Sequence, residues 1–277
     1  PQAAITMHMQ QAGYPHFITE GGWAMPNRFR TEEQLIMAAY ASLQGIDGLF
    51  PFVVEGDWSL RIQKWPIQTA GTMGQYPAAS LIYRRGYVEE GPVAINEALK
   101  LEDLYEFEGA ALSQPLGLDD ARAADVPEGV QPEVDSLASM DPMAFYVGRV
   151  MQSIGENPGQ SALLRNLPDY IDREAKVVRS ATGQLTLDYG KGVLRVDAPC
   201  AKGATGFLGD AGAQRLGGLT ARLDNEYGAV ICVSLRPWSE YPWSSAEMAC
   251  DAASGTRRPI PFGLNGALSR CERSAAV

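Results

Sequence analysis

The sequence predicts an α/β segment followed by an all-β unit, and two patterns lead to this fold class. Near the N-terminus, two short apolar runs at 16–20 and 48–54 flank a segment whose apolar residues recur every three to four positions. A strand, a helix and a strand in this order, each strand ending in polar residues, are typical of a parallel β/α unit. From residue 145 onward, short alternating segments about ten residues apart indicate an antiparallel sheet of the sandwich or barrel type.

The composition indicates a globular chain and excludes some partners. Its 277 residues are 45% hydrophobic and 20% charged, enough to bury a sizeable core. The net charge of −10 opposes binding to nucleic acid or to an anionic membrane, because both would repel the chain. Neutral ligands such as carbohydrates, and also cations, are compatible with this charge. No apolar run approaches the roughly 20 residues that cross a bilayer, so no membrane partner is expected.

Cysteine and histidine usage argues against a metal site. The four cysteines all fall in the C-terminal third without a C-x-x-C pair, so one or two disulfides remain open and zinc is not expected. With His8 and His16 as the only histidines, we expect neither a metal nor a cofactor. The first residues lack the basic region of a signal peptide. Because the chain begins at proline, an upstream leader is an alternative, which would favour a secreted or periplasmic location.

The first predicted helix covers residues 35–44. Thr31 to Gln34 have the pattern of a capping box, and Gly45 is a typical C-terminal stop. Apolar or small residues at helical spacing form its predicted inner face: Leu35, Ala38, Ala39, Ser42 and Leu43.

Three further elements and a change in composition follow. Residues 73–86 resemble a helix with proline in its first turn and glycine after its end, residues 93–97 a strand, and residues 101–105 a helical turn. Residues 108–142 are rich in proline, acids and alanine, which indicates a linker or a long loop.

Short alternating strands separated by glycine-containing turns are predicted beyond this loop. They cover residues 145–150, 176–180, 185–189, 193–197 and 229–235. Residues 236–277 show no period, so they are predicted to be an irregular tail.

Several segments together resemble the last third of a (β/α)8 barrel of clan A glycoside hydrolases, close to β-galactosidases and cellulases. They are ITEGGW at 18–23, AAYASLQGIDGL at 38–49 and GQYPAASLIYRRG at 74–86. The residues from SATGQLTLDY at 180–189 to ATGF at 204–207 are similar to the β-sandwich that follows such barrels. The resemblance covers residues 16–235. It implies a partial barrel segment over 1–107 and a β-sandwich over 145–235. Composition and the loss of periodicity add a linker or long loop over 108–144 and an irregular tail over 236–277.

The resemblance implies that Glu20 is the nucleophile of a retaining enzyme, at the end of the seventh barrel strand. Retention needs a second carboxyl group about 5 Å away. In the family this acid follows an asparagine on the fourth strand, which has no counterpart upstream of Glu20. The pair Asn96-Glu97 comes after the eighth strand and does not match. Three alternatives remain: the chain is a fragment, a partner chain completes the barrel, or another pair of carboxylates acts.

Glu55 is the best second carboxylate within the chain, with Asp57 as a less direct candidate. Neighbouring parallel strands lie ~4.8 Å apart, so acids at their ends can approach the separation that retention requires. Aromatic side chains stack on sugar rings, and an arginine can hold a hydroxyl or a charged substituent. The candidate substrate-binding residues are Trp23, Arg28, Asp57, Trp58 and Trp65. Solvated strand ends and ordinary packing are the alternative interpretation of these residues.

Two functional hypotheses follow. The first is a retaining glycoside hydrolase acting on a polysaccharide or oligosaccharide, with Glu20 as nucleophile and Glu55 as acid/base. The second is a non-catalytic carbohydrate-binding or scaffold module derived from such an enzyme. An incomplete barrel would expose strand edges and an apolar face, which predicts a homo-oligomer, a complementing chain or a closed rearrangement of the first hundred residues.

Overall fold

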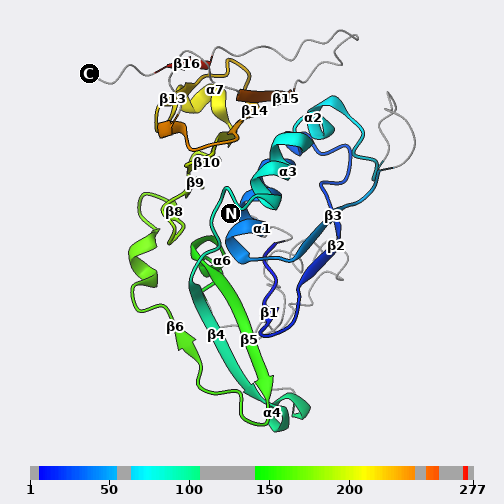
Figure 1. Ribbon diagram of the computed structural model, residues 1–277, viewed down its shortest axis with the longest axis vertical. Coiled ribbons are helices and arrows are strands. Elements are labelled where there is room, and N and C mark those ends of the chain that lie inside the picture. Colours follow the sequence, from blue (N-terminus) through cyan, green and yellow to red (C-terminus); the bar gives the residue numbers. More distant parts are fainter. Residues whose placement is uncertain (1–5, 55–63, 107–140, 241–247, 256–270, 274–277) are drawn as a thin grey trace, which may run out of the picture.

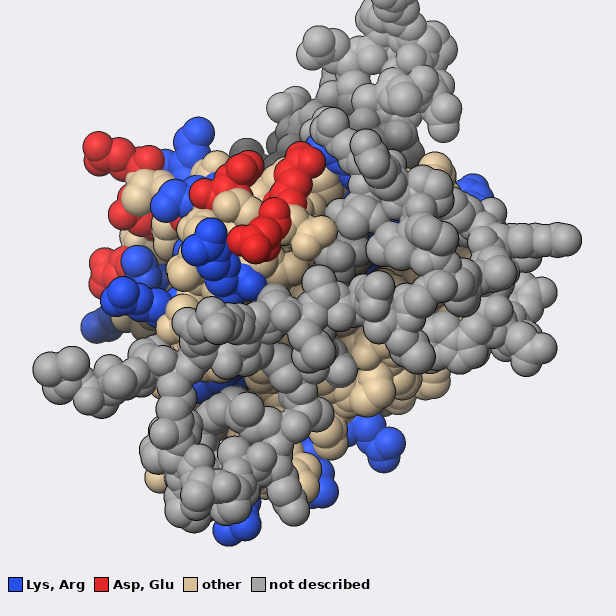
Figure 2. All heavy atoms as spheres, turned by 90° about the horizontal axis from the view of Figure 1, so that it is seen from above, with Lys and Arg blue, Asp and Glu red and all other residues tan. Residues whose placement is uncertain are grey.

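The chain folds into mixed helices and strands with one large antiparallel sheet (Figure 1). The computed structural model describes residues 6–54, 64–106, 141–240, 248–255 and 271–273. Within these ranges no helix is long and apolar enough to cross a membrane. On the face shown in Figure 2, the described acidic side chains gather in one part with basic side chains among them, and further basic side chains lie elsewhere on the face.

The predicted parallel β/α unit is present near the N-terminus. Strand β2 (Phe17–Gly21) pairs in parallel with β3 (Gly48–Pro51), and helix α1 (Glu33–Gln44) connects them. Gly45 ends the helix in the left-handed conformation at φ 65°, which glycine adopts without strain. Within the described residues β2 and β3 form a two-stranded sheet, so these residues form no closed barrel.

The predicted capping box is wrong. Thr31 lies in the 3-10 turn η1 (Arg30–Glu32), and the N-cap of α1 is Glu32, which makes no side-chain cap hydrogen bond. Thr31 is buried, and its hydroxyl has no hydrogen-bond partner. The extra turn moves the start of the helix past Thr31, and the acids that follow it bind Trp23 instead.

The elements that follow the β/α unit match their predictions. Short α2 (Ala70–Met73) precedes α3 (Tyr76–Arg84), which has Pro77 in its first turn and Gly86 beyond its end at φ +60°. Strand β4 (Val93–Lys100) and helix α4 (Leu101–Tyr105) come next along the chain.

Residues 145–150 do not open the antiparallel region, so that prediction is wrong. They form helix α6 (Ala144–Val147) and the start of β5 (Arg149–Gly155). Strand β5 pairs in parallel with β4 and with β1 (Gln10–Gln11), in a sheet of order β1-β5-β4-β6 that ends with β6 (Ala162–Leu163).

Buried Gln44, at the end of α1, explains this placement. Its Nε2 donates to the carbonyl oxygens of Phe145 at 2.7 Å and Gly148 at 2.6 Å. Its Oε1 accepts from the Val150 N–H at 3.2 Å. One side chain therefore holds α6 and β5 against the N-terminal unit.

The large antiparallel sheet has seven strands in the order β15-β14-β11-β10-β9-β8-β7. The antiparallel prediction is confirmed in coarse terms, because the predicted segments 176–180, 185–189, 193–197 and 229–235 lie in this sheet. Its seven strands are β7 (Ile171–Asp172), β8 (Val177–Arg179), β9 (Leu185–Asp188), β10 (Val193–Ala198), β11 (Ala201–Gly206), β14 (Tyr227–Ser234) and β15 (Met248–Gly255). Short turns η3 (Leu167–Tyr170), α7 (Leu208–Ala211) and η4 (Trp238–Glu240) lie between or beside them.

The C-terminal residues that the structure describes are not irregular, which corrects the tail prediction. Strand β15 pairs with β14 along its whole length, from Tyr227↔Gly255 to Ser234↔Met248. Strand β16 (Cys271–Arg273) pairs with β13 (Leu219–Ala221), which also pairs with β12 (Gln214–Leu216).

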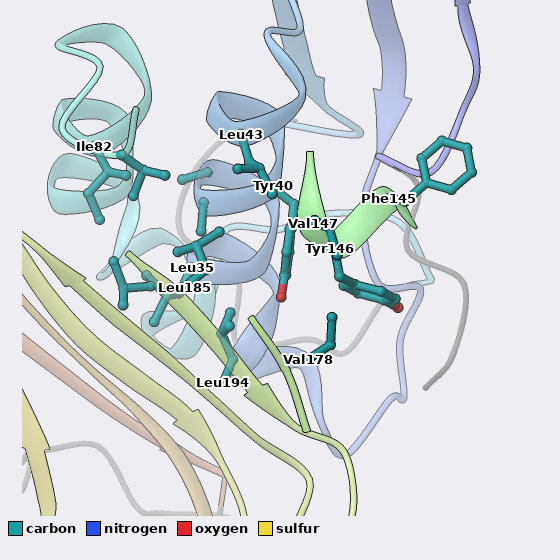
Figure 3. Close-up of a cluster of buried hydrophobic side chains, with 14 of the residues drawn as sticks. Leu35, Tyr40, Leu43, Ile82, Phe145, Tyr146, Val147, Val178, Leu185 and Leu194 are labelled. Atoms are coloured by element: carbon teal, nitrogen blue, oxygen red, sulfur yellow. The ribbon is translucent and has the colours of Figure 1, made fainter. Parts of the chain in front are cut away.

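The hydrophobic core crosses the predicted boundary at 108–144. One cluster joins side chains from α1, α3, α6 and the antiparallel sheet, as Figure 3 shows for Leu35, Ile82, Phe145, Leu185 and Leu194. Gly203 in β11 makes room for α1, because a Cβ there would lie 3.1 Å from both Leu35 Cδ2 and the Val230 carbonyl oxygen. The helix and the sheet therefore pack in direct contact, and a pocket lies beside this contact.

Candidate functional site

A pocket of about 580 Å³ lies between the start of α1 and the antiparallel sheet. The segment after β2 forms one wall, and strands β9, β10, β11 and β14 contribute the opposite wall. Seven aromatic side chains line it: Trp23, Phe29, Tyr40, Tyr146, Tyr189, Phe207 and Tyr227. Among the described residues that line the pocket, Glu32 alone carries a charge.

Glu32 is held by two aromatic donors. Its Oε1 accepts a hydrogen bond from Trp23 Nε1 at 3.0 Å, and its Oε2 accepts one from the Tyr227 hydroxyl. Burial raises the pKa of Glu32, and these two hydrogen bonds offset part of that shift because they stabilise the carboxylate. Burial and the charge of Glu32 raise the pKa of Tyr227 far above its usual range, so Tyr227 remains a donor.

Glu33 fixes the backbone of the same tryptophan. It is completely buried, its Oε2 accepts from the Trp23 N–H at 3.0 Å, and its Oε1 accepts from Gln34 Nε2 at 3.1 Å. Burial raises the pKa of Glu33 to about 7, against the opposing effect of these hydrogen bonds. Two successive acids at the start of α1 therefore position Trp23, one through its indole and one through its backbone.

Three rings pack on one another at the edge of the pocket. The Tyr227 centroid lies 4.7 Å from that of Phe29 and 5.0 Å from that of Phe207, and the last two are 5.6 Å apart. Gly192 makes room for Phe207, because a Cβ there would come within 2.8 Å of the ring. The guanidinium carbon of Arg28 lies 4.4 Å over the Phe29 ring.

Tyr40 and Tyr146 form a second aromatic pair, between α1 and α6 (Figure 3). Both are buried, and their rings meet edge to face at 5.2 Å. This geometry is favourable for aromatic pairs and fixes both rings beside the pocket.

The structure describes four of the seven predicted site residues. Trp23 lines the pocket, whereas Glu20 lies exposed near the carboxyl end of β2 and is not among the pocket residues. Arg28 is exposed above Phe29. Trp65 is 46% exposed, lies edge to face with Phe52 at 5.8 Å and has Lys64 Nζ 4.4 Å over its ring. The remaining three, Glu55, Asp57 and Trp58, lie outside the described residues.

Sequence reasoning missed most of the pocket. Glu32 fell inside the supposed capping box, and the rings that surround it come from positions as distant as Phe29 and Tyr227. The sequence feature that could have indicated this site was the pair of adjacent acids, Glu32 and Glu33, at the start of an apolar helix.

Neither a metal cluster nor a known relative helps to define this site. Within the described residues, no three His, Cys, Asp or Glu side chains lie close enough together to hold a metal ion. No protein-family model, curated protein or solved structure gives a significant match to the chain.

Proposed function

We propose that this chain is part of a carbohydrate-active protein, a retaining-type glycoside hydrolase with Glu20 as its nucleophile. The observation that carries the proposal is an exposed carboxylate near the carboxyl end of a parallel strand, followed by Gly21, Gly22 and an aromatic residue held in place. An accessible carboxylate is what attack on a sugar ring requires, and aromatic side chains are typical of sugar-binding surfaces.

The segments that leave β2 and β3 start side by side, which supports Glu55 as the second carboxyl group. The Phe52 N–H donates to the Gly21 carbonyl oxygen at 2.8 Å. Glu55 follows three residues later along the chain, and a retaining mechanism would require its carboxyl group about 5 Å from that of Glu20. In this proposal Glu55 protonates the leaving oxygen and then activates water.

Backbone contacts connect the segment of Trp65 to the segments that follow β2 and β3, which supports Trp65 as a substrate contact. The Val53 N–H donates to the Trp65 carbonyl oxygen at 3.1 Å, beside the segment that leads to Glu55. The Met25 N–H donates to the Lys64 carbonyl oxygen at 2.7 Å, which joins the loop of Trp23 to the same region. Trp65 would then stack on a sugar ring, and Arg28, Asp57 and Trp58 would contact the substrate nearby.

The proposal is tested by release of reducing sugar from a panel of polysaccharides. We expect Glu20→Gln to abolish release while the circular dichroism spectrum is unchanged, and Glu55→Gln to lower it strongly. Glu102→Gln, at an exposed glutamate on α4, is the matched control and should retain full activity. Azide should restore turnover to Glu20→Gly as a glycosyl azide, because a small anion replaces the missing nucleophile. Unchanged activity of Glu20→Gln would refute the assignment.

The second candidate function is a non-catalytic carbohydrate-binding module. It is favoured by the way Glu32 and Glu33 are engaged in hydrogen bonds with Trp23, which suits a fixed binding surface better than proton transfer. Calorimetric binding of an oligosaccharide that is equal in wild type and Glu20→Gln, with no product after long incubation, would support it.

A further inference from the structure

We propose that the pocket between α1 and the antiparallel sheet binds a quaternary ammonium group. This inference does not rest on the proposed glycosidase activity, because Glu20 does not line the pocket. At about 580 Å³, the pocket is in the range of sites for small organic ligands.

The lining has the chemistry of an aromatic cage. Seven aromatic rings surround the space, and the face of each ring carries negative potential that attracts a cation. Arg28 already occupies a place over Phe29 at 4.4 Å, although Arg28 itself does not line the pocket. One ring of the cluster therefore already takes part in a cation–π contact, made by a residue outside the pocket lining.

Charge complementarity selects a cation over a neutral or anionic ligand. No lysine, arginine or histidine is among the described residues that line the pocket, and Glu32 is its one charged group. None of the ion pairs found among the described residues involves Glu32. Its hydrogen bonds from Trp23 and Tyr227 stabilise the carboxylate without neutralising it, and a bound cation would supply the missing positive charge.

A methylated ammonium suits this lining better than a primary one. A primary ammonium has three N–H donors that need acceptors, whereas the lining is mostly rings, with Asn27 and Thr205 among its few polar side chains. A quaternary group has no donors and is stabilised by ring faces and a nearby carboxylate, which this pocket provides.

The test compares choline with 3,3-dimethyl-1-butanol, which has the same shape without the charge. Titration calorimetry on the full chain should show choline binding at least about tenfold more tightly than the neutral alcohol. Glu32→Gln keeps the size of the side chain and one acceptor oxygen but removes the charge, so it should lose about tenfold in choline affinity while its affinity for the alcohol is unchanged. Tyr189→Leu keeps apolar bulk but removes a ring, so it should weaken choline binding more than alcohol binding. Glu102→Gln should leave both unchanged.

Three outcomes would overturn the proposal. The first is equal affinity for choline and the alcohol, and the second is no binding of choline. The third is a Glu32→Gln variant that melts like the wild type and binds choline with unchanged affinity. Loss of sugar-releasing activity in Glu20→Gln with intact choline binding would leave this inference standing, so the two proposals fail separately.

Discussion

Glu33 is a buried carboxyl group that makes the stability of the protein depend on pH, and Glu32, whose pKa burial also raises, acts in the same direction. Burial raises its pKa to about 7 from the ordinary value of 4.5, so the folded state binds this proton more tightly than the unfolded state. The stabilisation is fully present below pH 4.5 and is lost as the pH rises to 7. A shift of this size is equivalent to about 3 kcal/mol at most.

We therefore expect Glu33→Gln to reduce the fall in stability that the wild type shows between pH 5 and pH 8. Urea unfolding of both proteins at the two pH values measures this difference. The comparison with the variant is needed because burial lowers the pKa of His8 and His16, which titrate in the same window with the opposite sign. An equal pH dependence in the two proteins would contradict the assignment.

The sequence predicted individual residues of the pocket better than it predicted the residues that they contact. Trp23 was selected as an aromatic contact, and it does line the pocket. The acids beside Trp23 in space were assigned to helix capping, because a sequence pattern of local spacing cannot show that the chain folds back to meet them. Tyr227, which completes the carboxylate's hydrogen bonds, is separated from Glu32 by 195 positions.

Gln44 is the residue through which helix α1 holds α6 and β5 in place. It is completely buried and satisfies two carbonyl groups and one N–H of the segment from Phe145 to Val150. Replacement by leucine preserves volume but leaves these backbone groups without a partner, so we expect a loss of about 2–4 kcal/mol of stability.

Chemical denaturation of Gln44→Leu tests this role, with Gln160→Leu at an exposed position as the control. The control should differ from wild type by less than about 0.5 kcal/mol. Wild-type stability in Gln44→Leu would show that α6 and β5 do not depend on this glutamine.

Helices were predictable where the sequence contains glycine or proline residues that mark their ends. Gly45, Pro77 and Gly86 mark helix ends, and the helices they bound lie where expected. Strand β15 was missed because its sequence, MACDAASG, consists mainly of small residues without alternation, and its pairing comes from the backbone of β14. Strand β5 was placed in the wrong sheet, because an apolar run does not specify its neighbour.

The whole molecule combines a parallel β/α unit and an antiparallel sheet, as predicted in coarse terms, but shares one core between them. Residues such as Leu35 and Gly203, which bring the two parts together, carry no sequence signal of their contact. The pocket forms at this junction, so its existence follows from packing that only the folded chain shows.

The two-stranded β2-β3 sheet predicts association with another chain. Phe17 and Phe50 are 50% and 53% exposed on these strands, and their rings lie 6.4 Å apart. Within the described residues each strand pairs only with the other, so both have an outer edge with unpaired backbone groups. Exposed apolar side chains beside such edges favour self-association or binding of a complementing chain.

Light scattering on a size-exclusion column tests this prediction, and we expect a mass above that of one chain that rises with concentration. Phe17→Lys combined with Phe50→Lys should shift the protein to a monomer, because two like charges at the interface repel their copies. Tyr105→Lys, at an 80% exposed aromatic on α4, should leave the mass unchanged. A wild-type monomer at every concentration would contradict self-association through β2 and β3. Binding of a different chain at this sheet would then be the remaining form of the prediction.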